Sequence, residues 1–394
     1  MKVVVLGGAG YIGSCAVREL VKRAPDIEVV IAEKNVEAAS KLVAEVGGKT
    51  SVKSVDANEH KSLVEAMKDA VVVLSTLGPY YVFGEKVLKA AMEAKTNFID
   101  INDDWDATEK CLELDKEANN SKITAVIGLG ATPGLTNLMA RYGADQLDRV
   151  DEIHIAWGWT ALDPKIKGTA ILDHYFHCMT GEVDSYRNGK WVKIPANSEP
   201  EIVEFVSPIG RLEVVSCGHP EPITIPRYIK GVKNVFLKGG GWPSGETWIG
   251  EFLLKTGMIK MTEITINGMP ISARSLASQL VLALPKLAPE FLDSKMNEVV
   301  EKYGEFAMEG GVLRTEVKGE RRGKFTRYIY GCGAPGDFMT ALPAVIGVLM
   351  FTRGQIKQKG GVFAPEGIID TKLFFKELTK DIPVEETKVE PISL

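Results

Sequence analysis

Apolar residues in the first third of the chain gather into short runs that are separated by longer amphipathic stretches. Six runs are rich in Val, Ile and Leu, as buried parallel strands are: 2–6, 28–32, 51–55, 70–75, 97–101 and 123–127. The intervening stretches have helical periodicity, with helices expected over 14–23, from 36, up to 67, over 83–94 and over 107–118. This alternation predicts an α/β domain with a doubly wound parallel (Rossmann) sheet and right-handed crossovers.

The pattern changes after residue 133, where hairpin signals replace the strand–helix alternation. Asn188-Gly189 is typical of a tight hairpin turn. Strands are also expected at 315–317 and 328–330, joined by a charged loop at 318–324. These features predict a second, α+β domain over 134–333 with a largely antiparallel sheet, which we assign to substrate binding and dimerisation.

An apolar segment of small residues, 334–351, predicts a buried helix that returns to the first domain. The first domain would then comprise 1–133, completed by 334–380. The charged end of the chain, 383–394, is expected to be loose. A chain of 394 residues agrees with two domains, since single hydrophobic cores seldom grow that large.

The segment Gly7-Gly8-Ala9-Gly10-Tyr11-Ile12-Gly13 joins the first strand to the first helix. Gly8, Gly10 and Gly13 fit a G-x-G-x-x-G fingerprint, and a register that starts at Gly7 fits a G-x-x-G-x-x-G spacing equally well. In either register one glycine makes a tight turn, one admits a pyrophosphate, and one lets the helix pack on the strand. The phosphates would lie at the helix N-terminus, so the segment predicts a dinucleotide site.

Glu33 ends the second strand at the position where such folds place an acid against the adenosine ribose. A carboxylate there favours NAD, because it would repel the 2′-phosphate of NADP by up to roughly 4 kcal/mol. Lys34 follows directly and would neutralise such a phosphate if it turned inward, which leaves NADP open. Capping of the next helix is the structural alternative for Glu33.

Ligands of doubly wound sheets lie outside the carboxyl ends of the strands. Cofactor contacts are therefore expected from Gly8, Ala9, Gly10, Tyr11, Ile12, Gly13, Glu33, Lys34, Asp56, Ala57, Ser75, Thr76, Leu77, Gly78, Pro79, Asp100, Ile101, Gly130, Thr132 and Pro133.

Composition narrows the class of protein. A net charge of −5 argues against a nucleic-acid binder or an anionic-membrane binder. The five cysteines are scattered without a C-x-x-C pair, which indicates reduced thiols and no metal site. The first strand begins at once and the longest apolar run is too short to span a bilayer, so a cytoplasmic protein is expected.

The glycine segment by itself also resembles extended short-chain dehydrogenases and sugar-nucleotide epimerases. Those enzymes need a Tyr-x-x-x-Lys pair on one helical face, where the lysine lowers the pKa of the tyrosine. The match in this chain, Tyr186 to Lys190, spans the Asn188-Gly189 hairpin turn. The pair is therefore not expected to share a helical face, and we reject that family.

Six further segments resemble the saccharopine dehydrogenase-like family, which includes saccharopine reductases, lysine 6-dehydrogenases and carboxynorspermidine synthases. They are Leu77-Gly78-Pro79-Tyr80-Tyr81, Phe98-Ile99-Asp100-Ile101, Gly130-Ala131-Thr132-Pro133-Gly134-Leu135-Thr136-Asn137, Gly218-His219-Pro220-Glu221-Pro222, Thr340-Ala341-Leu342-Pro343-Ala344 and Gly360-Gly361-Val362-Phe363-Ala364-Pro365-Glu366. The resemblance covers nearly the whole chain. It implies NAD(P)-linked hydride transfer at a carbon–nitrogen centre of an amino-acid-derived substrate.

Two departures bear on the substrate. Saccharopine-forming members carry Asp before Pro-Gly and Arg inside a Ser-Pro-x-Gly turn, where this chain has Thr132 and Ile209, although Arg211 lies two residues further on. An arginine fork is the natural receptor for a substrate carboxylate. Its loss favours a lysine 6-dehydrogenase-like activity, with saccharopine dehydrogenase and carboxynorspermidine synthase activities as alternatives. A non-catalytic dinucleotide-binding sensor or scaffold is the alternative of another class.

Amine oxidation needs a proton acceptor near the substrate nitrogen. Asp100 is the first choice, followed by His174 and Asp103, although each also has an ordinary structural interpretation. Substrate contacts are expected from Tyr80, Asp104, Arg211, Glu221 and Arg227. The partners expected are a small amino-acid or polyamine-precursor substrate and a second copy of the chain.

Overall fold

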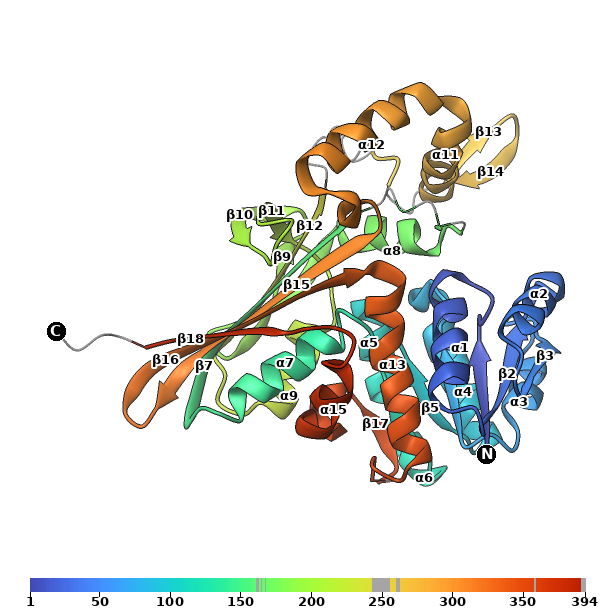
Figure 1. Cartoon of the computed structure of the whole chain (residues 1–394), viewed down its shortest axis with the longest axis horizontal. Coiled ribbons are helices and arrows are strands. Elements are labelled where there is room, and N and C mark those ends of the chain that lie inside the picture. Colours follow the sequence, from blue (N-terminus) through green and yellow to red (C-terminus); the bar gives the residue numbers. More distant parts are fainter. Residues whose placement is uncertain are drawn as a thin grey trace. The chain divides into compact units, whose positions relative to one another are not determined.

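Seven parallel strands form the central sheet of the first structural unit (Figure 1). Six of them lie at the apolar runs that predicted strands, whereas the seventh, Gly361–Phe363, was not predicted. Their spatial order is β17 (Gly361–Phe363), β6 (Thr124–Val126), β5 (Asn97–Asp100), β4 (Val72–Ser75), β1 (Lys2–Leu6), β2 (Glu28–Glu33) and β3 (Thr50–Ser54). The direction of winding reverses between β1 and β4. The ligand of such a sheet binds at this reversal, beyond the carboxyl ends of the strands.

The computed structural model describes residues 1–160, 163, 165–166, 168–242, 256–259, 263–357 and 359–390. Within the first unit, the helices are α1 (Tyr11–Arg23), α2 (Val36–Val46), α3 (His60–Met67), α4 (Tyr80–Ala94), α5 (Trp105–Glu113), α6 (Asp115–Asn120), α7 (Leu135–Ala144), α13 (Gly336–Thr352), α14 (Pro365–Ile368) and α15 (Thr371–Leu378). The single helix expected over 107–118 is two helices, because the chain breaks at Leu114.

The inner strands of this unit are largely apolar because both faces of the sheet are covered there, whereas the edge strand β3 is polar and mostly exposed. Val3, Val4 and Val5 have no exposed surface, although their side chains alternate between the two faces. Helix α13 returns to this unit, as its small residues predicted. A Cβ on Gly347 would lie 2.4 Å from the Leu129 side chain, so glycine permits the close packing of α13.

The first unit consists of Met1–Gln146, Arg227–Ile229 and Asp337–Pro383. It therefore includes α7, which the expected boundary at residue 133 assigned to the second domain. Helix α7 packs on the returning segment, where the rings of Tyr142 and Phe375 lie 5.3 Å apart. The helix joins the first unit through these tertiary contacts, which local sequence does not reveal.

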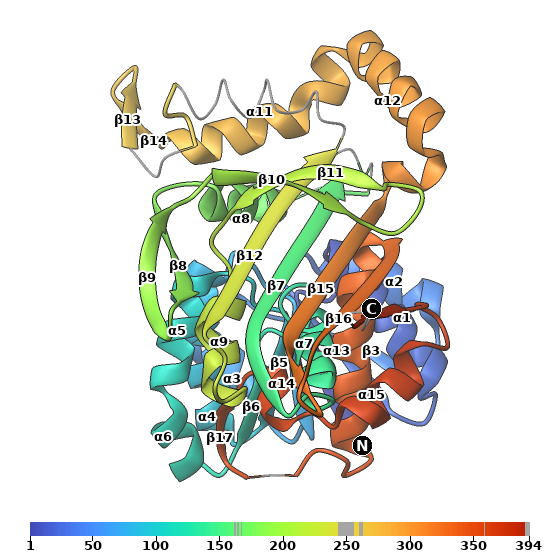
Figure 2. The ribbon, with the colours of Figure 1, turned by 90° about the vertical axis from the view of Figure 1, so that its left-hand side faces the viewer.

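The second unit contains a mixed sheet of long strands (Figure 2). Its main path is β10 (Ser198–Glu204), β11 (Arg211–Ser216), β12 (Asn234–Trp242), β7 (Arg149–Thr160), β15 (Gly310–Arg321), β16 (Lys324–Pro335) and β18 (Glu385–Val389). Off this path, β8 (Glu182–Arg187) pairs with β12 and with β9 (Lys190–Pro195). All of these pairings are antiparallel except that of β12 with β7. The expected α/β architecture with a second, largely antiparallel sheet is confirmed.

Two expectations for this sheet are wrong. The segment 318–324 is not a charged loop, since β15 and β16 pair up to Arg321 and Lys324 and leave a two-residue turn. The charged Lys318 and Glu320 lie on either side of the buried Gly319 within β15, so they belong to a strand and not to a loop. The chain end is not loose up to Val389, because β18 pairs with β16 from Gly331↔Glu385 to Arg327↔Val389. Residues 391–394 lie outside the described residues.

The remaining elements of the second unit are α8 (Ala170–Cys178), the first part of α9 (Glu221–Tyr228), β13 (Glu263–Ile266), β14 (Met269–Ser272), α11 (Ala273–Leu287), α12 (Pro289–Tyr303) and the 3₁₀ turn η2 (Glu305–Met308). Trp157 is buried in the sheet, and a Cβ on Gly239 would lie 2.1 Å from its ring. Across the described residues of both units, no helix combines the length and apolarity that crossing a bilayer requires.

Candidate active site

The glycine-rich loop after β1 is closed so tightly that only glycine fits its last position. Gly7 has φ +71°, and the N–H of Gly10 donates to the carbonyl oxygen of Gly7 (3.0 Å). A Cβ on Gly13 would lie 2.2 Å from that same carbonyl oxygen and 2.7 Å from Oγ1 of Thr76. Gly13 therefore lets α1 pack directly against the loop and the end of β4.

The start of α1 has the character of an anion site. Among the described residues, no side chain caps this helix, and its first turn carries no acidic residue. Backbone N–H groups at an uncapped helix N-terminus, together with the helix dipole, favour a phosphate group. The loop thus fits the pyrophosphate that its sequence predicted.

Glu33, at the end of β2, is hydrogen-bonded to the glycine loop. Its Oε2 accepts from the N–H of Ala9 (3.3 Å), and its Oε1 accepts from the N–H of Lys34 (2.8 Å). The side chain of Lys34 forms an ion pair with Asp56 (3.0 Å) at the end of β3. The N–H of Asn58 and the ammonium of Lys34 both lower the pKa of Asp56. Hydrogen bonds and an ion pair therefore connect Glu33, Lys34 and Asp56 at the ends of two neighbouring strands.

The exit of β4 closes the other side of the loop. Thr76 donates its hydroxyl to the carbonyl oxygens of Leu6 (2.9 Å) and Gly7 (3.2 Å), which joins β4 to β1 across the reversal of the sheet. Ser75 is buried. The predicted contacts Ala57, Leu77, Gly78 and Pro79 are each partly exposed at these strand exits.

Asp100 is a fully buried carboxyl group at the end of β5. Its Oδ1 accepts from the N–H of Gly128 (2.7 Å) and of Asn102 (3.1 Å), whereas Oδ2 has no hydrogen-bond partner among the described residues. Burial raises the pKa of Asp100 to about 7, against the opposing effect of the two N–H donors. Ile101, also a predicted contact, is buried beside it.

The segment that follows β6 is held by its own backbone. The N–H of Leu129 donates to the carbonyl oxygen of Asp100 (2.8 Å), and the N–H of Gly130 donates to the carbonyl oxygen of Pro133 (3.0 Å). Gly134 has φ +118°, and a Cβ there would lie 2.3 Å from the carbonyl oxygen of Gly130. Thr132, at the tip of this turn, is partly exposed. The segment is thus a rigid turn beside the Asp100 carboxyl.

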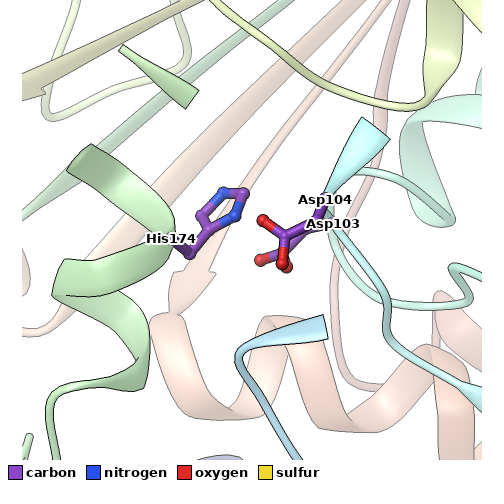
Figure 3. A group of neighbouring side chains, drawn as sticks. All are labelled: Asp103, Asp104 and His174. Atoms are coloured by element: carbon purple, nitrogen blue, oxygen red, sulfur yellow. The ribbon is translucent and has the colours of Figure 1, made fainter. Parts of the chain in front are cut away.

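Three predicted substrate or catalytic residues cluster near Asp100. The hydroxyl of Tyr80 donates to the carbonyl oxygen of Ser75 (3.2 Å), and burial, together with Asp100 and Asp103, raises its pKa well above the usual range. Asp104 (Figure 3) is buried and accepts from the N–H of Tyr81 (2.9 Å), so it caps the start of α4. Asp103, its neighbour, is partly exposed.

The other predicted residues are distributed between the units. His174 lies on α8 (Figure 3). Its ring packs edge-to-face with the ring of His219, and the two ring centroids lie 5.2 Å apart. Glu221 is fully buried at the start of α9 and its Oε2 lies 3.3 Å from Nδ1 of His219, so it forms part of the interior. Arg211 is exposed on β11 in the second unit, and Arg227 is exposed in the first.

Two residues that support Asp100 were not assigned from the sequence. Asn102 is fully buried and also donates its side-chain amide to Oγ1 of Thr108 (3.2 Å). Gly128 has φ +73°, and its N–H makes the shortest of the hydrogen bonds to Asp100. The role of Gly128 could have been predicted from its position directly after a predicted strand. Nothing in the local sequence predicts that Asn102 is buried.

A nicotinamide dinucleotide fits these residues. The glycine loop and the start of α1 would hold the pyrophosphate, and Glu33 lies where the adenosine ribose of such folds binds. The exits of β4, β5 and β6 would then face the nicotinamide end, and Asp100 lies buried at the end of β5 with no hydrogen-bond partner for its Oδ2 among the described residues. The first unit therefore has the architecture of a dinucleotide-binding domain.

Comparison with known proteins agrees with this class. Residues 3–126 match the family model of the saccharopine dehydrogenase NADP binding domain. A saccharopine dehydrogenase [NADP(+), L-glutamate-forming] from Pyricularia oryzae is 27% identical over 157 residues, which are 40% of this chain and 32% of that protein. A lipid droplet localized protein from Caenorhabditis elegans is 28% identical over 138 residues, 32% of each chain. The matches thus span about a third of these curated relatives.

The fold extends this likeness to the whole chain. The apo saccharopine dehydrogenase (L-Glu forming) of Saccharomyces cerevisiae superposes with a TM-score of 0.68 and 16% identity, over 98% of this chain and 99% of the yeast chain. The first part of the chain is therefore similar to the NADP binding domain of the saccharopine dehydrogenase family, which its motifs resembled, and the whole chain shares the fold of the yeast enzyme. The expected nicotinamide dinucleotide is supported, and the family model is one of NADP binding.

Proposed function

We propose that this protein is a dehydrogenase that transfers a hydride between a nicotinamide dinucleotide and a carbon–nitrogen centre of an amino-acid-derived substrate. The observation that carries the proposal is Asp100: a buried carboxyl group with a pKa of about 7 and an unpartnered Oδ2, at the strand exits beside the dinucleotide site. A group of that pKa is half ionised at neutral pH, which suits it to accept a proton and later release it.

In the direction of amine oxidation, the substrate loses one N–H proton and the hydride on the adjoining carbon, and becomes an imine. A bound oxidised nicotinamide supplies the hydride acceptor. Asp100 takes the proton on Oδ2, while the N–H groups of Gly128 and Asn102 keep Oδ1 in place. Burial excludes water from the carboxyl group, so its proton affinity remains high enough for the transfer.

A primary amine such as the side chain of lysine is our first substrate candidate. Thr132 and the buried Ile209 stand where saccharopine-forming relatives carry an acid and an arginine, and neither side chain can bind a second carboxylate through charge. Saccharopine is the second candidate, favoured by the name of the Pyricularia relative and by the fold shared with the yeast enzyme. Carboxynorspermidine is the third.

Substrate choice is tested by following reduced nicotinamide absorbance with each candidate amine and either dinucleotide. We expect lysine to give a kcat/KM at least about 10-fold above that for saccharopine, because a second carboxylate without an ionic partner costs more than about 1.4 kcal/mol. An Ile209→Arg variant tests the reason, and should reduce that difference. A wild type that prefers saccharopine would contradict the assignment of lysine while leaving the reaction class intact.

We further propose that NAD(H) is the preferred cofactor. Glu33 holds a carboxylate against the glycine loop, and the charge of Lys34 is already shared with Asp56. A Glu33→Ala variant is expected to shift the ratio of NADP to NAD affinity by about 10-fold toward NADP, through loss of repulsion at the 2′ position.

Glu37→Ala is the matched control for this experiment, because Glu37 is an exposed acid on α2 that pairs with Lys41. Titration of both dinucleotides by intrinsic fluorescence gives the ratio for each variant. A wild type that already prefers NADP, with a ratio unmoved by Glu33→Ala, would mean that Glu33 does not oppose the ribose substituent.

A further inference from the structure

Trp157 carries a hydrogen-bond donor that the interior of the second unit does not use. The side chain lies on β7 and is 5% exposed, and its Nε1 has no hydrogen-bond partner among the described residues. Buried polar atoms in proteins are almost always hydrogen-bonded, so an exception calls for a physical explanation. An indole N–H can only donate, and a ligand that satisfies it must therefore offer an acceptor atom.

Two other tryptophans of the second unit do find partners within the chain. Nε1 of Trp242, which is fully buried, donates to the carbonyl oxygen of Ala307 (2.7 Å). Nε1 of Trp191 donates to the carbonyl oxygen of Pro222 (3.0 Å). The unit can thus satisfy an indole N–H with its own backbone, and at Trp157 it does not.

The ring of Trp157 is held in place by the neighbouring strand. Trp157 lies opposite Gly239 where β7 pairs with β12 (Figure 2). A Cβ on Gly239 would lie 2.1 Å from Cζ2 and 2.2 Å from Cε2 of the indole, so the ring lies against the backbone of β12 at a position that only glycine permits. The unused donor therefore has a fixed position.

His219 places a second polar group beside this donor. It is buried, and its ring centroid lies 5.8 Å from that of Trp157 and 5.2 Å from that of His174. Its Nδ1 lies 3.3 Å from Oε2 of the fully buried Glu221. Within the described residues this is the only hydrogen bond of the His219 ring. Glu221 thus orients the ring and leaves Nε2 for a ligand.

The chemistry of these two groups suits a carboxylate. Trp157 supplies a neutral donor, and the His219 ring donates from Nε2 when both of its nitrogens are protonated. A carboxylate accepts from both kinds of N–H and brings a single negative charge. A phosphate brings up to two charges and is bound mainly by Arg, Lys or helix N-termini, which these residues do not provide.

We propose that Trp157 and His219 bind the carboxylate of the amino-acid substrate, with Glu221 orienting the His219 ring. We call this pair the carboxylate receptor. Both residues belong to the second unit, whereas the residues assigned to the dinucleotide belong to the first. The inference rests on the proposed function, because it names the groups that hold the substrate of that reaction. A receptor for one carboxylate also agrees with lysine as the first substrate candidate.

The test compares lysine with pentane-1,5-diamine, which is lysine without its carboxylate. Isothermal titration uses the full chain saturated with reduced dinucleotide, so that no amine is oxidised during the measurement. The wild type is expected to bind lysine at least about 10-fold more tightly than the diamine, because hydrogen bonds to a charged group are strong. Trp157→Phe should lower lysine affinity by about 10-fold and leave diamine affinity unchanged.

Trp242→Phe is the matched control, since it removes the same part of a buried indole. It should keep the lysine affinity of the wild type but lower the thermal midpoint more than Trp157→Phe does, because it alone breaks a hydrogen bond within the chain. This crossed result separates a ligand-binding role from a structural one. His219→Gln is an independent variant and should also bring lysine affinity close to that of the diamine.

A wild type that binds the two amines equally overturns the carboxylate receptor. So does a folded Trp157→Phe protein that keeps the wild-type preference for lysine. Hydride transfer, measured in the same preparations, separates this inference from the proposed function. A wild type that prefers lysine in binding but reduces no dinucleotide with any amine supports the receptor and overturns the dehydrogenase.

Discussion

Gly13→Ala is expected to abolish dinucleotide binding, with a loss of affinity of at least about 100-fold. The added Cβ would lie 2.2 Å from the Gly7 carbonyl oxygen and 2.8 Å from Cα of Gly8. Both neighbours are backbone atoms, so no side chain can rotate to make room. The loop must therefore move away from the position in which its N–H groups can meet a pyrophosphate. Isothermal titration with NAD and with NADP measures the loss.

Gly168→Ala is the control, because a Cβ at Gly168 meets nothing within 4 Å. It should bind both dinucleotides as the wild type does. Circular dichroism and the thermal midpoint separate lost binding from lost folding, since overpacking of this kind costs about 1–3 kcal/mol. Retained affinity in a folded Gly13→Ala protein would contradict a pyrophosphate site in this loop.

Asp100→Asn is expected to remove dehydrogenase activity and to raise stability above neutral pH. The amide cannot accept the substrate proton, so kcat should fall by at least about 100-fold while dinucleotide affinity changes little. For the wild type, kcat/KM for amine oxidation should rise with pH through about 7, where Asp100 ionises. In the variant this ionisation disappears.

The effect on stability follows from the raised pKa of Asp100. The folded carboxyl has a pKa of about 7 and the reference value is 3.8, so the folded state holds its proton more tightly than the unfolded state. The contribution of Asp100 to stability is therefore fully present below the reference value and is lost as the pH rises toward 7. The full difference is roughly 4 kcal/mol. Above that window the ionised, buried group destabilises the wild type.

Urea unfolding at about pH 5 and about pH 8 measures this difference. The Asp100→Asn protein should lose less stability than the wild type between the two values. Asp26→Asn serves as control, because Asp26 is an exposed acid and should follow the wild-type profile. A pH dependence that is equal in wild type and Asp100→Asn would show that Asp100 is ionised throughout, and would weaken its assignment as proton acceptor.

The part of the fold that local pattern dictates could be predicted from the sequence. Val3, Val4 and Val5 form a run that only a strand covered on both faces explains, and the glycines that follow leave one plausible connection to α1. The length of the hairpin of β15 and β16 was underestimated, also because of the local sequence. Lys318 and Glu320 alternate with buried residues on a half-exposed face, and their charge resembles that of a loop.

The features that could not be predicted from the sequence depend on tertiary contacts between residues far apart in the chain. Asp100 was chosen for its place after a strand, but its pKa depends on complete burial and on the N–H of Gly128, which is 28 residues away. Glu221 was expected to contact substrate, whereas the structure buries it beside His219 at the start of α9. The assignment of α7 to the first unit likewise rests on a ring contact between Tyr142 and Phe375.

The central claim is that this chain transfers a hydride between a dinucleotide and a carbon–nitrogen centre. It is tested most directly with amine substrates deuterated on the carbon bonded to nitrogen, incubated with wild type and Asp100→Asn. The account predicts deuterium in the reduced dinucleotide formed by the wild type and at most a trace with the variant. A wild type that binds the dinucleotide, yet transfers no deuterium from lysine, saccharopine or carboxynorspermidine, would contradict it and indicate a non-catalytic dinucleotide-binding protein.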